Sequence, residues 1–285
     1  MGTLWTVAVP LGNDRDLSPR AAAVLGRADL ILAEDTRRAG LLLSRLGVRG
    51  QGFLSLHDHN EEARIERVLA ALAGPSKEGG EAEVALVSDA GTPLLSDPGF
   101  RLVRACRAAG HRVSPVPGPS APVAALSACG LPPQPFAFLG FLPRKAGEAR
   151  CVLEHFGRAG CTLVLFERKD RVRKTLALAA EVLGPREFCL ARELTKDHEE
   201  FIVGRLDALD SLTFTELGEF TVVLGPGEAP AVASEEELDA ALRAEAAAGG
   251  RPREVVRRVL ARVTGWSSKA VYARLEALGG PGRGR

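Results

Sequence analysis

Short apolar runs alternate with helical stretches in the first half of the chain, and this alternation limits the possible folds more than any other feature. The runs have the length and the β-branched content typical of buried strands, and they cover residues 4–9, 29–33, 83–87 and 112–116. Ser18-Pro19 and Asp97-Pro98 each join a capping side chain to a proline suited to the first helical position, so both predict helix starts. Strands that alternate with helices predict a parallel α/β layer with right-handed crossovers.

The second half of the chain predicts a further α/β or α+β region, followed by a helical end. Its strands are expected over residues 136–141, 161–166, 187–191, 200–205 and 219–224. Beyond the one that starts at Ser18-Pro19, helices are expected over residues 36–46, 60–73, 97–109, 119–129, 147–157, 171–183, 234–248, 253–263 and 267–278. The last two resemble a helix-turn-helix unit.

Proline and glycine mark the expected domain boundaries. The segment GLPPQP at 130–135 indicates a hinge, and residues 225–230 indicate a linker. We therefore expect an N-terminal α/β domain over 1–130, a second α/β domain over 131–228 and a helical extension over 229–285. The final PGRGR is expected to be disordered.

The charges are distributed unevenly between the body of the chain and its C-terminal end. The 285 residues include 37 Lys and Arg against 36 Asp and Glu, and 46% are hydrophobic, which excludes wholesale disorder. Residues 251–285 hold nine basic and two acidic residues, which leaves 28 basic and 34 acidic residues in the body. A basic tail on an acidic body favours an anionic partner, although an Arg-rich tail that only promotes solubility is the simpler alternative.

Three features bear on the cellular location. Five cysteines, none in a C-x-x-C pair, favour neither a disulfide framework nor a zinc site, and they fit a reducing cytoplasm. The N-terminus MGTLWTVAVP lacks the basic and long apolar regions of a signal peptide. Residues 113–143 carry no Asp, Glu, Lys or Arg, but their eight prolines exclude a membrane-spanning helix. We expect a cytoplasmic protein that binds no membrane and no metal.

Three loops that follow predicted strands are the candidates for ligand binding. No G-x-G-x-x-G and no P-loop sequence occurs, so the ligand must be held in another way. Open parallel sheets bind ligands at the carboxyl ends of their strands, where this chain places residues 9–13, 88–99 and 117–121. Gly91 and Gly118 permit close backbone approach, and the prolines stiffen the loops.

Several long motifs give the chain a specific resemblance. They are AVPLGN, AEDTR, HDHNE, VSDAGTPLLSDPG, PVPGPSAPVAAL, GLPPQPFAFLGFLPRK and RELTKDHEEF, in this order. Together they resemble the ribosomal RNA small subunit methyltransferase I family, within the tetrapyrrole-methylase-like superfamily. The resemblance implies a two-domain class III methyltransferase fold of α/β type with a small helical C-terminal extension. It also implies S-adenosylmethionine as methyl donor, a homodimer, and transfer to the ribose 2′-oxygen of a cytidine in the decoding region of 16S ribosomal RNA, free or in the small subunit.

The chain departs from the family pattern in one place. Family members resemble F-Y-E-S-P-H-R where this chain has LFERKDR at 165–171, so Glu167 and Arg171 keep their places while the middle becomes charged. No role for the family's serine or histidine is carried over, and the new basic side chains could contact phosphate instead.

The three loops and the resemblance together predict the donor-binding residues. Asp89 is the most specific of these predictions, because a carboxylate can contact the ammonium group or the ribose hydroxyls of the donor. Phe166 and Leu190 are expected to cover the adenine. The full set is Pro10, Leu11, Gly12, Asp89, Ala90, Gly91, Thr92, Leu95, Ser120, Ala121, Phe166 and Leu190.

A ribose hydroxyl is a weak acid, so a base or hydrogen-bond acceptor is also expected. The candidate catalytic residues are Glu34, Asp35, His57, Glu167, Glu193 and Lys196, the last as a cation for the developing oxygen charge. For most of these a structural role stays open: Asp35 as a helix cap, Glu34 as a partner of Arg37, and Glu193 with Lys196 as a surface ion pair. His57 and His59 lack a third ligand for a metal.

RNA contacts are expected from Arg37, Arg38, Arg144, Lys145, Arg168, Lys169 and the basic tail. Trp266 either stacks on a base or packs between helices. Two other functions remain open on the sequence: a methyltransferase acting on a corrin precursor, and a non-catalytic RNA-binding factor.

Overall fold

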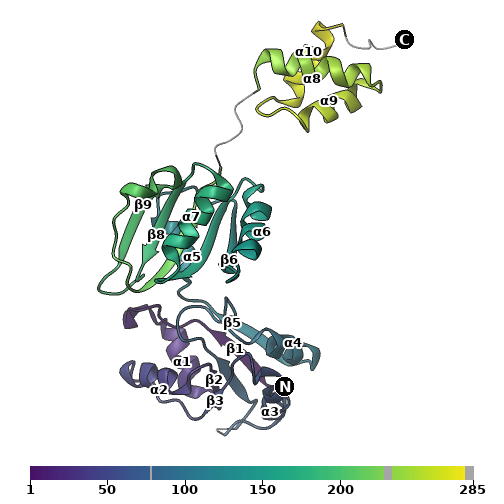
Figure 1. Ribbon diagram of the computed structural model, residues 1–285. Helices are drawn as coiled ribbons and strands as arrows, with labels where there is room; N and C mark the ends of the chain where they lie inside the picture. Colours follow the sequence, from purple (N-terminus) through teal and green to yellow (C-terminus); the bar gives the residue numbers. More distant parts are fainter. Residues whose placement is uncertain (78, 228–232, 280–285) are drawn as a thin grey trace. The chain divides into compact units, whose positions relative to one another are not determined.

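The computed structural model describes residues 1–77, 79–227 and 233–279 and divides the chain into two compact units, Met1–Gly227 and Glu228–Arg285. The first unit contains two five-stranded sheets (Figure 1). The described part of the second unit contains three helices. None of the described helices has the length and apolar character needed to cross a bilayer.

The first sheet consists of β1 (Thr3–Val7), β2 (Leu30–Ala33), β3 (Phe53–Ser55), β4 (Glu83–Leu86) and β5 (Arg112–Val116) in the order β3-β2-β4-β1-β5. All of its pairings are parallel, which confirms the predicted layer. The short strand β3 was not predicted, because three residues give no periodicity to detect. The strand order reverses direction around β1 and β4, and the carboxyl ends at such a point form a ligand crevice.

Helices cover both faces of the first sheet, as the alternation requires. On one face α1 (Pro19–Arg27) and α2 (Thr36–Arg45) pack on strand residues such as Val7 and Ile31. On the other face α3 (Glu61–Ala73) and α4 (Phe100–Ala108) pack on residues such as Leu32 and Leu86. Burial of these apolar faces contributes roughly 25 cal/mol for each Å² removed from water.

The two predicted capping signals have different outcomes. Ser18 accepts a hydrogen bond from the Ala21 amide and starts α1, as predicted. The prediction of a helix start at Asp97-Pro98 is wrong, because α4 begins at Phe100 after Gly99 and has no cap from its own chain segment. Buried Glu61 of α3 takes that role, since its Oε1 accepts the Leu102 amide at 2.9 Å.

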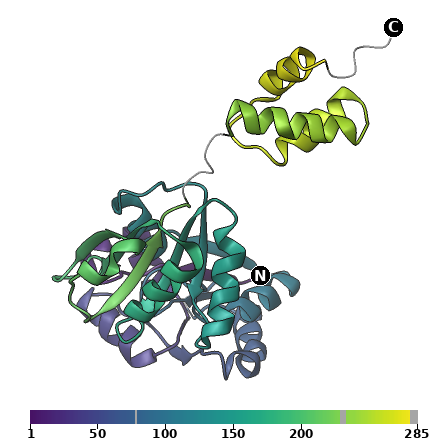
Figure 2. The same cartoon turned by 45° about the horizontal axis from the view of Figure 1, so that its top comes forward.

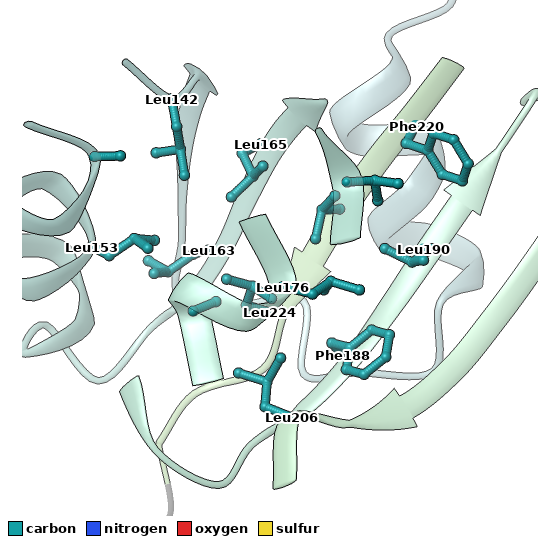
Figure 3. Packing of buried hydrophobic residues seen from close by; sticks show 14 of the residues in the cluster. Leu142, Leu153, Leu163, Leu165, Leu176, Phe188, Leu190, Leu206, Phe220 and Leu224 are labelled. Carbon is teal, nitrogen blue, oxygen red and sulfur yellow. The ribbon is translucent and has the colours of Figure 1, made fainter. Parts of the chain in front are cut away.

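The second sheet has the order β6-β7-β10-β8-β9 and mixed pairing, as expected. Its strands are β6 (Phe136–Phe141), β7 (Thr162–Arg168), β8 (Glu187–Arg192), β9 (Glu200–Arg205) and β10 (Glu219–Leu224). Its outer face packs against α6 (Ala146–Gly157) and α7 (Val172–Leu183) through a leucine-rich cluster that includes Leu163, Leu176 and Phe188 (Figure 3). Two short 3-10 helices, Asp14–Asp16 and Leu206–Ser211, complete the unit.

The helix α5 (Ala121–Ala128) follows the first sheet in the chain but packs on the inner face of the second. Its Ala125 and Leu126 lie in one buried cluster with Val164, Cys189 and Val223. The expected hinge at 130–135 continues this contact, since Leu131 is buried in the same cluster and Pro132 O accepts the Thr162 hydroxyl. The two sheets are therefore joined by a packed helix as well as by the chain.

The C-terminal unit has its own core, formed by α8 (Glu235–Ala247), α9 (Pro252–Leu260) and α10 (Ser268–Ala277) (Figures 1 and 2). Buried Glu245 pairs with Arg258 and Arg262 at 2.6 and 2.7 Å. Trp266 packs against this core and donates its Nε1 hydrogen to Ala233 O, so the packing alternative is confirmed. Residues 228–230 of the expected linker, and the final PGRGR, lie outside the described residues.

Candidate active site

A cavity of about 720 Å³ lies between the carboxyl ends of the first sheet and the inner face of the second sheet. Ligand pockets in proteins commonly measure about 300–1,000 Å³. Its wall combines loop backbone from the first sheet with side chains from the second sheet, and the two halves differ in construction.

Hydrogen bonds between the three predicted loops make the first half of the wall rigid. Val9 and Gly91 exchange backbone hydrogen bonds of 3.0 and 3.1 Å, and the Thr92 hydroxyl donates to Pro119 O at 2.9 Å. Gly91 has φ +74°, and a Cβ there would lie 2.9 Å from Leu11 Cδ2. The left-handed conformation therefore favours glycine at this turn, and a Cβ would in addition displace the Leu11 side chain.

Most of the predicted donor-binding residues meet on this wall. Those that line the cavity are Leu11, Asp89, Ala90, Gly91, Thr92, Leu95, Ser120, Ala121 and Phe166. Pro10 and Gly12 flank Leu11 but lie outside the cavity wall. A Cβ on Gly12 would lie 2.3 Å from Lys196 Cγ, so this glycine leaves room for the lysine stem.

The placement of Leu190 over the adenine is wrong. Leu190 is fully buried in the cluster between the second sheet and its outer helices (Figure 3). Because successive side chains in a strand point to opposite faces, its neighbour Ala191 lines the cavity instead.

Phe166 and Phe141 form an aromatic part of the wall, with ring centroids 5.6 Å apart. The neighbouring Glu167 points the other way: its side chain is fully buried and accepts hydrogen bonds from the Thr175 hydroxyl and the Arg168 amide. Glu167 borders the cavity, but its carboxylate is committed to these hydrogen bonds, so the residue is a structural anchor for α7. Arg168, Lys169 and Asp170, the positions that depart from the family pattern, line the cavity.

The candidate bases near β2 separate into one cavity residue and two structural ones. Glu34 lines the cavity, with no ion pair to Arg37 among the described contacts. Asp35 caps α2 by accepting the Arg37 and Arg38 amides at 2.9 and 3.3 Å, so the capping alternative holds. His57 lies outside the wall, with its Nε2 2.9 Å from the Asn60 side-chain nitrogen. Asn60 gives no helix-capping hydrogen bond and instead accepts the His57 amide.

A second acidic group on the wall escaped the sequence-based prediction. Asp97 lines the cavity, and burial, together with the negative charges of Glu34, Asp89 and Asp58, raises the pKa of its carboxyl to about 6. It was missed because Asp-Pro before a helix is typical of a cap. Asp89 differs from it, since its Oδ2 is 2.6 Å from Arg38 Nη1.

Lys196 is held at the edge of the cavity by two carboxylates. Its Nζ lies 3.0 Å from Glu193 Oε1 and 2.9 Å from Glu219 Oε2. Burial opposes the lysine charge, but the hydrogen bonds that Lys196 donates to Glu219 and Glu193 outweigh it and raise the pKa of Lys196. Glu193 and Thr195 both have positive φ, so the turn that presents Lys196 is strained. Glu193 itself lies outside the wall and positions the lysine.

Some of the predicted RNA-contacting residues line the cavity and others lie outside it. Arg38, Arg168 and Lys169 line the cavity. Arg37, Arg144 and Lys145 lie outside it, and Lys145 pairs with Glu148 at 2.9 Å. Over residues 1–77, 79–227 and 233–279, no group of three or more His, Cys, Asp or Glu side chains is placed to hold a metal ion.

Comparison with known proteins identifies the class to which this fold and cavity belong. The sequence profile of the tetrapyrrole (corrin/porphyrin) methylases matches residues 3–210. Two solved structures share the fold: the methyltransferase CobJ, with TM-score 0.58 and 20% identity over 82% of this chain and 98% of that one, and a diphthine synthase, with TM-score 0.60 and 17% identity over 79% and 90%. The chain is thus a tetrapyrrole-methylase-type protein, and the expected fold class is confirmed.

Curated relatives narrow the class. A ribosomal RNA small subunit methyltransferase I of Mesorhizobium japonicum is 42% identical over 95% of this chain and 90% of its own length. Another of Escherichia coli O157:H7 is 48% identical over 70% of this chain and 67% of its own length. The chain belongs to the ribosomal RNA small subunit methyltransferase I family. Its methyl donor is S-adenosylmethionine, which confirms the expected cofactor.

Proposed function

We propose that the protein transfers a methyl group from S-adenosylmethionine to the ribose 2′-oxygen of a cytidine in the decoding region of 16S ribosomal RNA. The observation that carries the proposal is the 42% identity to a ribosomal RNA small subunit methyltransferase I across 95% of this chain, including its C-terminal helices. The nucleotide, the ribose oxygen and the decoding region come from the resemblance described above.

The residues of the cavity fit this donor. Asp89 offers a carboxylate to an ammonium group or to ribose hydroxyls, and the close backbone at Gly91 leaves space for a ligand on the wall. Phe166 and Phe141 offer aromatic faces suited to stacking on adenine. A cavity of about 720 Å³ accommodates the donor together with part of a nucleotide.

The donor supplies an electrophilic methyl carbon on a sulfonium, whose positive charge disappears during the transfer. The main task of the protein is therefore to align the oxygen with that carbon. Loops tied by the Val9–Gly91 and Thr92–Pro119 hydrogen bonds hold one side of the alignment. Orientation of this kind contributes about 7–11 kcal/mol in favourable cases.

Lys196 is the cation that best fits the acceptor side of the reaction. It lines the cavity and is held by Glu193 and Glu219, which keep it protonated near neutral pH. A fixed ammonium group next to the reacting hydroxyl stabilises negative charge that develops on its oxygen.

The proposed partner is 16S ribosomal RNA or the small ribosomal subunit. We propose that the protein binds it as a homodimer in the cytoplasm. Arg38, Arg168 and Lys169 at the cavity are suited to phosphates near the target nucleotide. The C-terminal unit adds exposed basic side chains such as Arg253, Arg257 and Lys269. The RNA must offer its target in a loop or flipped out, because a ribose hydroxyl can reach the donor in the cavity only when its nucleotide leaves the helical stack.

The proposal is tested with the purified protein, tritiated S-adenosylmethionine and either small subunits or 16S RNA from cells that lack this protein. We expect label in one cytidine, and we expect the bond that follows it to resist alkaline cleavage, as 2′-O-methylation requires. Label on a base, label in a tetrapyrrole instead of RNA, or no uptake by either RNA substrate contradicts the proposal. Calorimetry with the donor separates a non-catalytic RNA-binding factor, which would show no donor affinity.

A further inference from the structure

The loop that follows β4 adopts a backbone conformation that costs energy just before a carboxylate residue. Leu94 and Ser96 have φ angles of 73° and 70°, and neither is a glycine. Side chains with a Cβ rarely adopt this left-handed conformation, and such positions persist only where the surrounding structure enforces them. The residue that follows is Asp97, whose side chain lines the cavity.

Asp97 is free of the structural role that its sequence position suggests. An aspartate before Pro98 and α4 would normally cap the helix, but Glu61 binds the Leu102 amide in its place. No hydrogen bond or ion pair to Asp97 occurs among the described residues. The helix is capped from another element, and the Asp97 carboxylate remains available to a ligand.

The other acids on the described cavity wall are paired, exposed or turned away. Asp89 pairs with Arg38, Glu219 is exposed and pairs with Lys196, and Glu167 is buried against Thr175. Glu34 and Asp170 are exposed. Asp97 alone among these acids is both half-buried and unpaired, which are the properties a proton acceptor needs in a closed site.

The charges that shift the pKa of Asp97 are all negative. Glu34 faces it from the end of β2, Asp89 from the end of β4, and Asp58 from the loop between β3 and α3. Arg38 of α2, which also lines the cavity, is held by Asp89. Burial and these three carboxylates raise the pKa of Asp97 to about 6, so the group is a stronger base than an ordinary aspartate and is still ionised at neutral pH.

We propose that Asp97 is the catalytic residue that accepts the proton of the substrate hydroxyl during methyl transfer. As the O–H bond breaks, its proton passes to an Asp97 carboxylate oxygen, and the oxygen electron pair forms the bond to the methyl carbon. The electron pair of the carbon–sulfur bond remains on sulfur, which becomes a neutral thioether. Asp97 then returns the proton to water. This inference rests on the proposed function, in which the acceptor is a hydroxyl.

The test measures single-turnover methylation of small subunits against pH for the wild type and for Asp97→Asn. We expect Asp97→Asn to lower the rate by about 10²–10⁴-fold, with donor affinity by calorimetry changed by less than about threefold. The wild-type rate should rise with pH through about 6, because only the ionised carboxylate accepts a proton, and this limb should vanish in Asp97→Asn.

Asp58→Asn is the matched control, since Asp58 lies outside the cavity wall but repels the Asp97 charge. Its loss should lower the pKa of Asp97 and move the limb to lower pH, with the rate at neutral pH unchanged. Asp97→Glu should recover part of the activity of Asp97→Asn.

A rate for folded Asp97→Asn within threefold of the wild type, or an unchanged pH limb in that variant, overturns the inference. If Asp97→Asn does not fold, the test depends on the rise of the wild-type rate near pH 6 and on its shift in Asp58→Asn. A rise that stays at the same pH in Asp58→Asn overturns the inference. A wild type that methylates a base, or no RNA at all, instead defeats the proposed function, so the two failures are distinguishable.

Discussion

The two halves of the cavity wall present different groups to a ligand: one presents loop backbone and the other presents side chains. The first sheet contributes backbone, in loops fixed by hydrogen bonds such as that from Thr92 to Pro119 O, and its ligand contacts are set by glycines and prolines. The second sheet contributes side chains on a strained turn, above all Lys196 between Glu193 and Glu219. Apart from Asp97, which the first-sheet loop directs to the acceptor, we infer that the backbone half binds the donor and the side-chain half acts on the acceptor. Changes in the two halves should therefore affect different kinetic steps.

Among the changes that separate the two halves, the largest effect is expected from Lys196→Met. Loss of the ammonium group should lower the methylation rate by about 10²–10³-fold, as does removal of one donor to a developing oxyanion. Donor affinity should change little, because the lysine belongs to the acceptor side. Lys145→Met is the control, since Lys145 forms a similar ion pair with Glu148 but lies outside the cavity. A loss of donor affinity that matches the loss of rate would contradict the inference that Lys196 acts on the acceptor and not on the donor.

The converse effect is expected from Gly91→Ala. The new Cβ would meet Leu11 Cδ2 at 2.9 Å, so the donor wall must shift, and donor affinity should fall by about 10²-fold. Gly130→Ala is a close control, because Gly130 has the same φ of +74° with nothing within 4 Å of its Cβ. That variant should lose about 1 kcal/mol of stability and keep its donor affinity. Equal loss in both variants would show that backbone strain alone is responsible.

Deletion of residues 228–285 tests whether the C-terminal unit contributes to donor binding or to RNA binding. The cut falls at the boundary of a unit with its own core, so residues 1–227 should still bind the donor. RNA binding should weaken on the order of tenfold, and the slope of log affinity against log salt should become shallower by about 0.7 for each single-strand phosphate that the unit neutralises in the full chain. An unchanged slope would show that the unit does not bind phosphate.

The smallest effect is expected from Thr92→Val. The substitution removes the hydrogen bond to Pro119 O and should cost about 1 kcal/mol of stability, measured by denaturant unfolding. Donor affinity should fall by only a few-fold, because the backbone bonds of Val9 and Gly91 remain. Ser127→Ala, which removes an exposed hydroxyl bond to Ala124 O, should leave both quantities nearly unchanged.

The difference between the halves also explains what could be predicted from the sequence. Glycines and prolines reveal rigid loops directly, so the loop pattern, together with the family resemblance, placed Gly91, Thr92 and Ser120 on the wall. Side chains on strands depend on register, and a shift of one residue exchanged Leu190 for Ala191.

Asp97 was missed for a different reason. Its role depends on Glu61, which is 36 positions earlier in the chain and caps α4 in its place. A local pattern cannot show that a distant side chain has already satisfied a helix start. Glu167 is the opposite case, in which a plausible base is committed to Thr175 by tertiary packing.

The helix α5 has a consequence for how the wall can change shape. Its N-cap residue Ser120 and its first residue Ala121 line the cavity, while its apolar side chains pack on the inner face of the second sheet. Because α5 connects the donor loops to the second sheet, we expect a change in the position of that sheet to move the residues at the start of the helix. A core substitution outside the cavity wall, such as Val223→Ala, should therefore change donor affinity.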